Sequence, residues 1–199
     1  MGENTPLFKT LSSIYFEQVF GLGSLNRINL DKLMETSEAM KGDPGKAVKT
    51  TRVEGEWLLD LDSGPQFRAV ISADGGEFIL EADQPKPLGG GGSRPSPIHY
   101  CLYGIAACTA ATFATIAASE GIRLRKMRVV IENKINFSRP LGLSDEPIVE
   151  GVNLEIFVDT DAGDEDIERL KKLTIERCPA IYCVTNPIKM ELSVNKATE

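Results

Sequence analysis

The residues of this chain whose types and spacing suit redox chemistry are its four cysteines, Cys101, Cys108, Cys178 and Cys183. Cys101 and Cys108 lie seven residues apart in a segment with helical character, so both project from one helix face, about 20° apart. Cys178 follows Ile167 by 11 residues and projects within about 20° of that apolar position on a second predicted helix. Two inward-facing thiols from distant parts of the chain can therefore meet.

A pair of neighbouring thiols is what a peroxidatic and resolving couple requires. One thiolate attacks the O–O bond of a peroxide and becomes a sulfenic acid, and the second thiol captures it as a disulfide before further oxidation. The alternative is passive, because free cysteine is among the most buried residue types and packs as a small hydrophobe. Spacing alone leaves both interpretations open. The C-x6-C and C-x4-C spacings are not usual for zinc, and neither a metal nor a cofactor is expected.

The helix that carries the first two cysteines is predicted to begin at Ser96–Pro97 and to end at Gly121. No Lys, Arg, Asp or Glu occurs between Arg94 and Glu120, a stretch long enough to cross a bilayer. Its Ala, Thr, Ser and Gly content carries little insertion energy, so we expect a helix buried in a protein core and no membrane span. A single chain has difficulty covering such a helix on all sides, which predicts an obligate homodimer.

Periodicity predicts the elements around this helix. Residues 1–45 are predicted to form a helical extension, which Gly42 and Pro44 end. Two or three antiparallel strands are expected between Val48 and Glu81, with a hairpin turn at Asp74–Gly75. Later elements are two half-buried strands, a helix and a last strand, at about residues 127–137, 148–158, 164–178 and 188–194. The glycine run at residues 89–92 is expected to be a flexible turn. This order of hairpins and helices favours an α+β fold.

Composition bounds the class of protein. The chain has 199 residues, of which 42% are hydrophobic and 26% charged, as expected of a folded globular unit. Its net charge of −7 opposes contact with phosphate backbones, so nucleic acid is not an expected partner. The start, Met1 to Pro6, lacks the basic and apolar regions of a secretory signal, which predicts a cytoplasmic protein with reduced thiols.

Several motifs together resemble one family. Gly90 to Gly92 and Pro95-Ser96-Pro97 precede an Ala-Ala-Cys motif that ends at Cys108, and Cys178-Pro179 follows about seventy residues later. This arrangement is similar to that of the osmotically inducible protein C and organic hydroperoxide resistance (OsmC/Ohr) superfamily. The resemblance covers residues 46–199 as an OsmC-like domain and leaves residues 1–45 outside it.

The resemblance implies a fold and an activity. The fold would have antiparallel curved sheets packed around a long buried central helix, in an intertwined homodimer with active sites at the subunit interface. The activity would be thiol-dependent reduction of hydroperoxides, preferentially organic ones, in oxidative-stress defence, with a small dithiol or a dithiol protein as reductant. By motif position, Cys108 would be the peroxidatic cysteine and Cys178 the resolving one.

One position departs from the family pattern. The best-studied branch activates its thiolate with an arginine that a glutamate steadies, and this chain carries Ile98 at the place of that glutamate. No motif places the arginine, so Arg52, Arg68 and Arg94 all remain candidates. The missing glutamate favours an alternative function, a non-catalytic dimeric protein that binds an apolar small molecule at the subunit interface. The retained pair of cysteine motifs favours catalysis.

Overall fold

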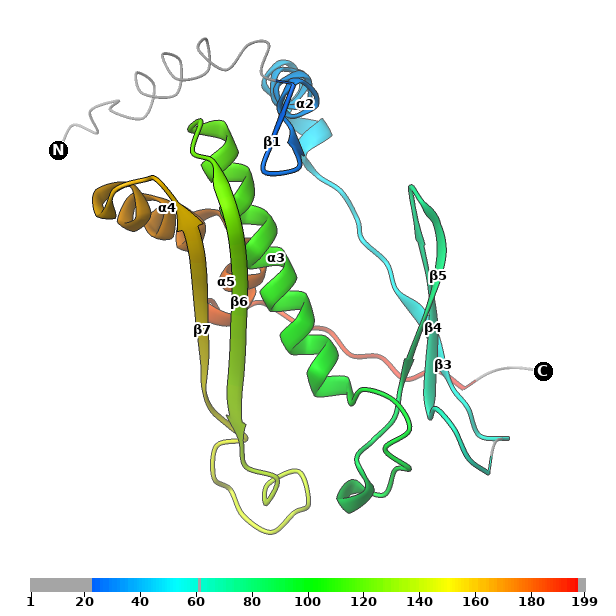
Figure 1. Ribbon diagram of the computed structural model, residues 1–199. Helices are drawn as coiled ribbons and strands as arrows, with labels where there is room; N and C mark the ends of the chain where they lie inside the picture. The colour runs from blue at the N-terminus through cyan, green and yellow to red at the C-terminus, as the bar shows by residue number, and fades with distance from the viewer. Residues whose placement is uncertain (1–22, 61, 197–199) are drawn as a thin grey trace, which may run out of the picture.

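The computed structural model describes residues 23–60 and 62–196 of the chain (Figure 1). The described part begins with a short hairpin, β1 (Ser24–Leu25) and β2 (Ile28–Asn29), followed by helix α2 (Leu30–Gly42). The predicted helical extension is thus correct for residues 30–42 and wrong for residues 23–29, while residues 1–22 lie outside the described part. The hairpin forms because Asn26 and Arg27 both adopt positive φ angles, 53° and 64°, which close a two-residue turn.

The hairpin is fastened to the C-terminal end of the central helix. The side-chain amide of Asn26 donates to the carbonyl of Ile122 at 2.9 Å and accepts from the N–H of Leu124 at 2.8 Å. Leu30 packs against Ala118, and both are fully buried. The segment after this contact runs through a 3-10 turn, η1 (Pro44–Ala47), to the first sheet.

The first sheet is antiparallel, with strands β3 (Glu54–Trp57), β4 (Phe67–Ala73) and β5 (Gly76–Ala82) in that order. The predicted hairpin turn at Asp74–Gly75 is confirmed, because Ala73 pairs with Gly76 on either side of it. Gly76 has a φ of 122° there, a backbone conformation that glycine adopts without the strain a side chain would cause. A short 3-10 turn, η2 (Lys86–Leu88), leads on toward the central helix.

The second layer is built around the central helix α3 (Pro97–Ser119). It contains the antiparallel pair β6 (Leu124–Ile135) and β7 (Val149–Thr160), then α4 (Asp164–Arg177) and α5 (Pro179–Thr185). Pro97 occupies the first helical position of α3, and the Ser96 N–H donates to His99 Nδ1 at 3.2 Å, which caps the helix start. Local signals therefore set both the start and the length of α3.

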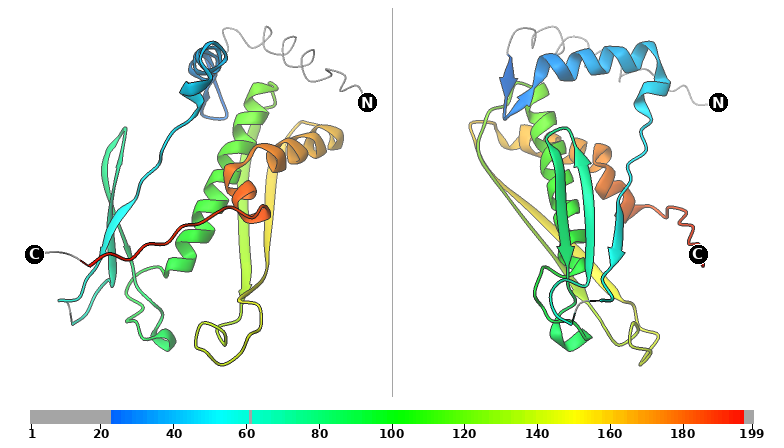
Figure 2. Two further views of the ribbon diagram at one scale, coloured as in Figure 1. Left: turned by 180° about the vertical axis from the view of Figure 1, so that it is seen from behind. Right: turned by 90° about the vertical axis from the view of Figure 1, so that its right-hand side faces the viewer.

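The core lies on one half of α3. Phe113, Ile116 and Ala117 pack with Leu170 of α4, and apolar side chains of β6 and β7 close the cluster. The N-terminal half of α3 is less covered, with Cys101, Tyr103 and Gly104 exposed. Figures 1 and 2 show why: the β3–β5 sheet stands apart from the layer of α3, β6 and β7. The central helix is buried within one chain only over its C-terminal half.

The predicted last strand does not form within the described chain. Residues 187–196 have no regular secondary structure, and Figure 2 shows the segment leaving α5 and running away from the β6–β7 layer. Its alternating apolar side chains are 52–90% exposed: Ile188, Met190, Leu192 and Val194. The pattern is that of a strand, but a strand requires a neighbour that supplies its hydrogen bonds, and the described residues contain no strand that pairs with this segment.

Candidate active site

The structure brings Cys108 and Cys178 together, with their sulfur atoms 3.7 Å apart. Cys108 lies in the middle of α3 and is half-buried, while Cys178 is 1% exposed. Cys178 ends α4 and also caps α5, because Pro179 stops one helix and takes the first position of the next. The break between the two helices aims the Cys178 side chain at α3.

The polar groups around Cys178 favour its thiolate. Burial acts to raise the pKa of this thiol, but hydrogen bonds from the Ile181 N–H and from the hydroxyls of Thr109 and Thr112 outweigh burial and hold the pKa below its ordinary value. Cys108 behaves in the opposite way. Burial raises the pKa of Cys108, which the Ala180 N–H only partly offsets, so we expect Cys178 to lose its proton before Cys108 does.

This division of charge predicts the titration of the reduced protein. In a Cys101→Ser, Cys183→Ser background, thiolate absorbance is expected to appear at a lower pH than for an ordinary thiol, because the pKa of Cys178 is lowered. Adding Cys178→Ser should remove this first step and leave ionisation only at higher pH. Adding Cys108→Ser should retain a low step. An unchanged first step in the Cys178→Ser protein would contradict the charge division.

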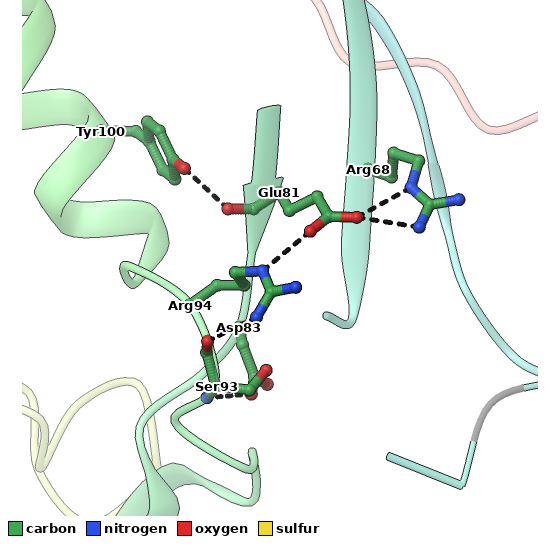
Figure 3. A network of polar contacts seen from close by, with 6 residues as sticks. All are labelled: Arg68, Glu81, Asp83, Ser93, Arg94 and Tyr100. Carbon is green, nitrogen blue, oxygen red and sulfur yellow. Dashed lines mark hydrogen bonds and ion pairs between the residues drawn. The ribbon is translucent and has the colours of Figure 1, made fainter. Parts of the chain in front are cut away.

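Two of the three candidate arginines converge on Glu81 (Figure 3). Arg68 of β4 donates to Glu81 Oε1 at 2.8 Å, and Arg94 donates to Glu81 Oε2 at 2.8 Å. Both bonds hold the pKa of the Glu81 carboxyl below its ordinary value, and the bond from Arg94 has the larger effect. Arg52 instead pairs with Glu54 at the exposed surface. Within the described part of the chain, no hydrogen bond or ion pair joins any of the three arginines to Cys108.

Glu81 is a residue that the sequence analysis missed. The family pattern predicts a glutamate at the start of the central helix, where Ile98 stands, whereas the carboxylate that binds the arginines comes from β5. A signal existed: a two-residue turn at Asp74–Gly75 places residue 68 opposite residue 81, and the register confirms the Arg68–Glu81 pair. Hairpin geometry alone was enough to pair the two charges.

The glycine run is an ordered loop and not the flexible turn that was expected. The buried Asp83 carboxylate accepts from the Gly91 N–H at 3.3 Å and the Ser93 N–H at 2.7 Å, which lowers its pKa. A Cβ atom on Gly90 would lie 2.0 Å from the Gln84 carbonyl oxygen, so only glycine fits there. The loop holds Arg94 at Glu81, and Tyr100 Oη donates to the Glu81 carbonyl at 2.7 Å (Figure 3).

The remaining cysteines lie outside this contact. Cys101 and Cys183 are exposed. Among the described residues, no group of three or more His, Cys, Asp or Glu side chains is placed to hold a metal ion. One surface hollow lies between residues 132–134 and 150–153, and another lies along α4. Neither of these hollows is lined by a cysteine.

These observations define an α+β protein in which a long apolar helix presents one thiol to a second thiol from a later helix. A family model described as OsmC-like protein matches residues 90–193, which covers the central helix, the β6–β7 pair and both cysteines. The chain belongs to the OsmC-like family. The resemblance predicted from the cysteine motifs is therefore confirmed.

Solved structures show the same fold. An OsmC-like protein from Mycoplasma pneumoniae is 20% identical, with a TM-score of 0.51 over 68% of this chain and 87% of its own. An organic hydroperoxide resistance protein from Legionella pneumophila is 19% identical, with a TM-score of 0.51 over 69% of this chain and 92% of its own. A comparison with curated proteins finds no match. The predicted α+β fold with antiparallel sheets and a long central helix is confirmed.

Helix α3 has the length and composition of a membrane span. Its C-terminal half nevertheless packs against α4 and β6, and the family to which the chain belongs consists of soluble proteins. The helix is therefore a core helix, as its alanine-rich composition predicted.

Proposed function

We propose that this protein is a thiol-dependent peroxidase that reduces hydroperoxides, preferentially organic ones, with Cys108 as the peroxidatic cysteine and Cys178 as the resolving cysteine. The observation that carries the proposal is the 3.7 Å contact between two sulfur atoms from residues 70 positions apart. A disulfide requires an S–S distance of about 2.05 Å, so a small side-chain movement closes the bond. The Legionella relative, an organic hydroperoxide resistance protein, supports this reaction class.

The exposure of the two cysteines supports this assignment of roles. A peroxide must reach the sulfur that it oxidises, and Cys108 is the more exposed member of the pair, whereas Cys178 lies beneath it at 1% exposure. The Cys108 thiolate attacks the terminal oxygen of the hydroperoxide, the O–O bond breaks, and Cys108 becomes a sulfenic acid. The leaving alkoxide takes a proton from water and departs as the alcohol. The Cys178 thiolate then attacks the Cys108 sulfur, the S–O bond breaks, and hydroxide leaves as the disulfide forms.

Reduction closes the cycle. A small dithiol, or the dithiol of a protein, attacks the disulfide through a mixed disulfide and leaves as its own disulfide, which restores both thiols. We place this chemistry in the cytoplasm, where such reductants keep thiols reduced. We assign it to an OsmC-like domain of residues 46–199, with residues 1–45 as an addition to it.

Activation of Cys108 requires a cation, because burial raises the pKa of this thiol. In one chain, Arg68 lies on β4, and the loop before α3 holds Arg94 beside it at Glu81 of β5. The β3–β5 sheet stands apart from the layer of α3, β6 and β7 (Figure 1). We propose an intertwined homodimer in which this sheet of one copy covers the exposed half of α3 of the other and brings the guanidinium groups to its thiol. Glu81 would hold both arginines in position, in the role that the family gives to the glutamate missing at Ile98.

The proposal is tested by hydroperoxide consumption with a dithiol reductant. We expect the parent protein to consume cumene hydroperoxide in the presence of dithiothreitol. The rate for Cys108→Ser should be lower by about 1,000-fold or more, the loss typical of removing a nucleophile. Cys101→Ser is the matched control, because this exposed thiol lies on the same helix and outside the pair. Equal rates for parent and Cys108→Ser would overturn the peroxidase proposal and leave the cysteines as passive residues.

A further inference from the structure

Cys178 touches a second polar group besides Cys108. The Thr109 hydroxyl oxygen lies 3.6 Å from Cys178 Sγ, and both residues are 1% exposed. Because Thr109 directly follows Cys108 on α3, the Cys178 sulfur contacts two successive side chains of one helix, at 3.6 and 3.7 Å. The hydroxyl and the peroxidatic sulfur therefore fix the Cys178 sulfur from the same side.

The Thr109 hydroxyl has two alternative acceptors. It donates to the Ile105 carbonyl at 2.8 Å, which satisfies the buried hydroxyl while Cys178 carries a proton. When Cys178 loses this proton, its sulfur becomes a charged acceptor at contact distance, and a hydroxyl rotor can turn toward it without moving the helix. A buried anion needs such a donor, since water does not reach a side chain of this exposure.

We propose that Thr109 is a catalytic residue of the resolving step, whose hydroxyl donates to the Cys178 thiolate and holds the sulfur against Cys108. The inference rests on the proposed peroxidase function for its biological role. In that step, the Cys178 thiolate attacks the Cys108 sulfenic acid, the S–O bond breaks, and hydroxide leaves. The lowered pKa of Cys178, to which the Thr109 hydroxyl contributes, agrees with this role.

The test separates the two halves of the reaction. Protein is mixed with one equivalent of cumene hydroperoxide, and samples quenched with N-ethylmaleimide are followed by mass spectrometry. In Thr109→Val, we expect unchanged consumption of peroxide but disulfide closure slowed roughly 10- to 150-fold, the value of one hydrogen bond to a charged atom. More Cys108 should then reach sulfinic acid under excess peroxide. Thr109→Ser, which restores the hydroxyl, should close at nearly the parent rate.

A second measurement does not depend on peroxide. In a Cys101→Ser, Cys183→Ser background, Cys108 is converted to a mixed disulfide with thionitrobenzoate. The Cys178 thiolate attacks the Cys108 sulfur, the mixed disulfide breaks, and coloured thionitrobenzoate is released. Release should be slowed by Thr109→Val and restored by Thr109→Ser. If the parent consumes no peroxide, the proposed function fails, and this release rate still decides the role of Thr109.

The controls give each outcome a meaning. Thr115→Val removes a hydroxyl from the same helix outside the thiol cluster and should leave closure unchanged. Parent-like closure in Thr109→Val would overturn the inference, as would a Thr109→Ser protein that closes as slowly as Thr109→Val. Slowing of both peroxide consumption and closure together with a lower melting temperature would identify Thr109 as a packing residue only, and would also overturn it.

Discussion

Deleting the C-terminal segment after Asn186 is expected to dissociate the proposed homodimer into monomers. In one chain, the apolar side chains of this segment are 52–90% exposed, so their removal should be almost neutral for an isolated chain. In a dimer that covers them, each side chain contributes about 1.5–3 kcal/mol when fully buried. Every 1.4 kcal/mol is tenfold in a dissociation constant, so we expect dimer affinity to fall by at least about 100-fold.

Sedimentation velocity across a range of concentrations measures this effect. The parent should sediment as a dimer at micromolar concentration and the truncated protein as a monomer. A matched control replaces the polar side chains of the same segment by alanine, at Lys189, Glu191 and Ser193. This control should remain dimeric. A monomeric parent would refute the dimer, whereas a dimeric truncated protein would show that another surface holds the copies together.

Replacing Leu170 by alanine is expected to lower the free energy of unfolding by about 2–5 kcal/mol. Leu170 is fully buried between α4 and the Phe113 cluster of α3, where the deleted methyl groups leave a cavity that the neighbours fill only in part. Leu143→Ala is the matched control, because this leucine is 75% exposed in the loop between β6 and β7. We expect it to change stability by less than about 0.5 kcal/mol.

Denaturant unfolding at matched protein concentration checks this pair, since a dimer makes apparent stability depend on concentration. Equal midpoints for the two leucine variants would mean that the α3–α4 contact does not support the fold. That contact also holds α4 against α3, the helix that carries Cys108. The Leu170→Ala protein should therefore lose disulfide closure at lower denaturant concentration than the Leu143→Ala protein.

The elements with strong local signals were predictable from the sequence. Helix α3 follows from Ser96–Pro97 at its start and Gly121 beyond its end, and α4 follows from an acidic first turn and an apolar face. Strands β6 and β7 follow from alternation, within three residues at the ends. In each case the information lies within the segment itself, because caps and side-chain periodicity act over a few residues.

Two of the misses share a physical cause, because the structure of the segment depends on contacts outside the segment itself. The β1–β2 hairpin is held by Asn26 against the turn after α3, and no periodicity within residues 23–29 announces this contact. The segment after α5 has the alternation of a strand, yet alternation does not supply a partner. Helix α5 was missed because Pro179 was interpreted only as a stop, although the same residue favours a first helical position.

The candidate site was predictable in part for the same reason. Helical phase was enough to aim Cys108 and Cys178 inward, and the structure places their sulfur atoms in contact. The charges were harder to place, because the partner of Arg94 depends on a loop that Asp83 organises through backbone N–H groups. In the proposed dimer, the arginines of one chain approach the thiol of the other. The sequence pattern of one chain does not predict such a contact between two chains.

The Asn26 contact has a consequence for the freedom of the first sheet. Hydrogen bonds fix the hairpin to the end of α3, so the chain is anchored on both sides of the first sheet, by the hairpin before it and by α3 after it. The linker on the N-terminal side is the stretch between Gly42 and Glu54. A linker of this length spans at most roughly 40 Å when fully extended, and the 3-10 turn shortens it. The sheet can therefore reach toward a neighbouring molecule only over a limited distance. In the proposed homodimer, we expect the Asn26 contacts to break before the two chains can separate and exchange partners.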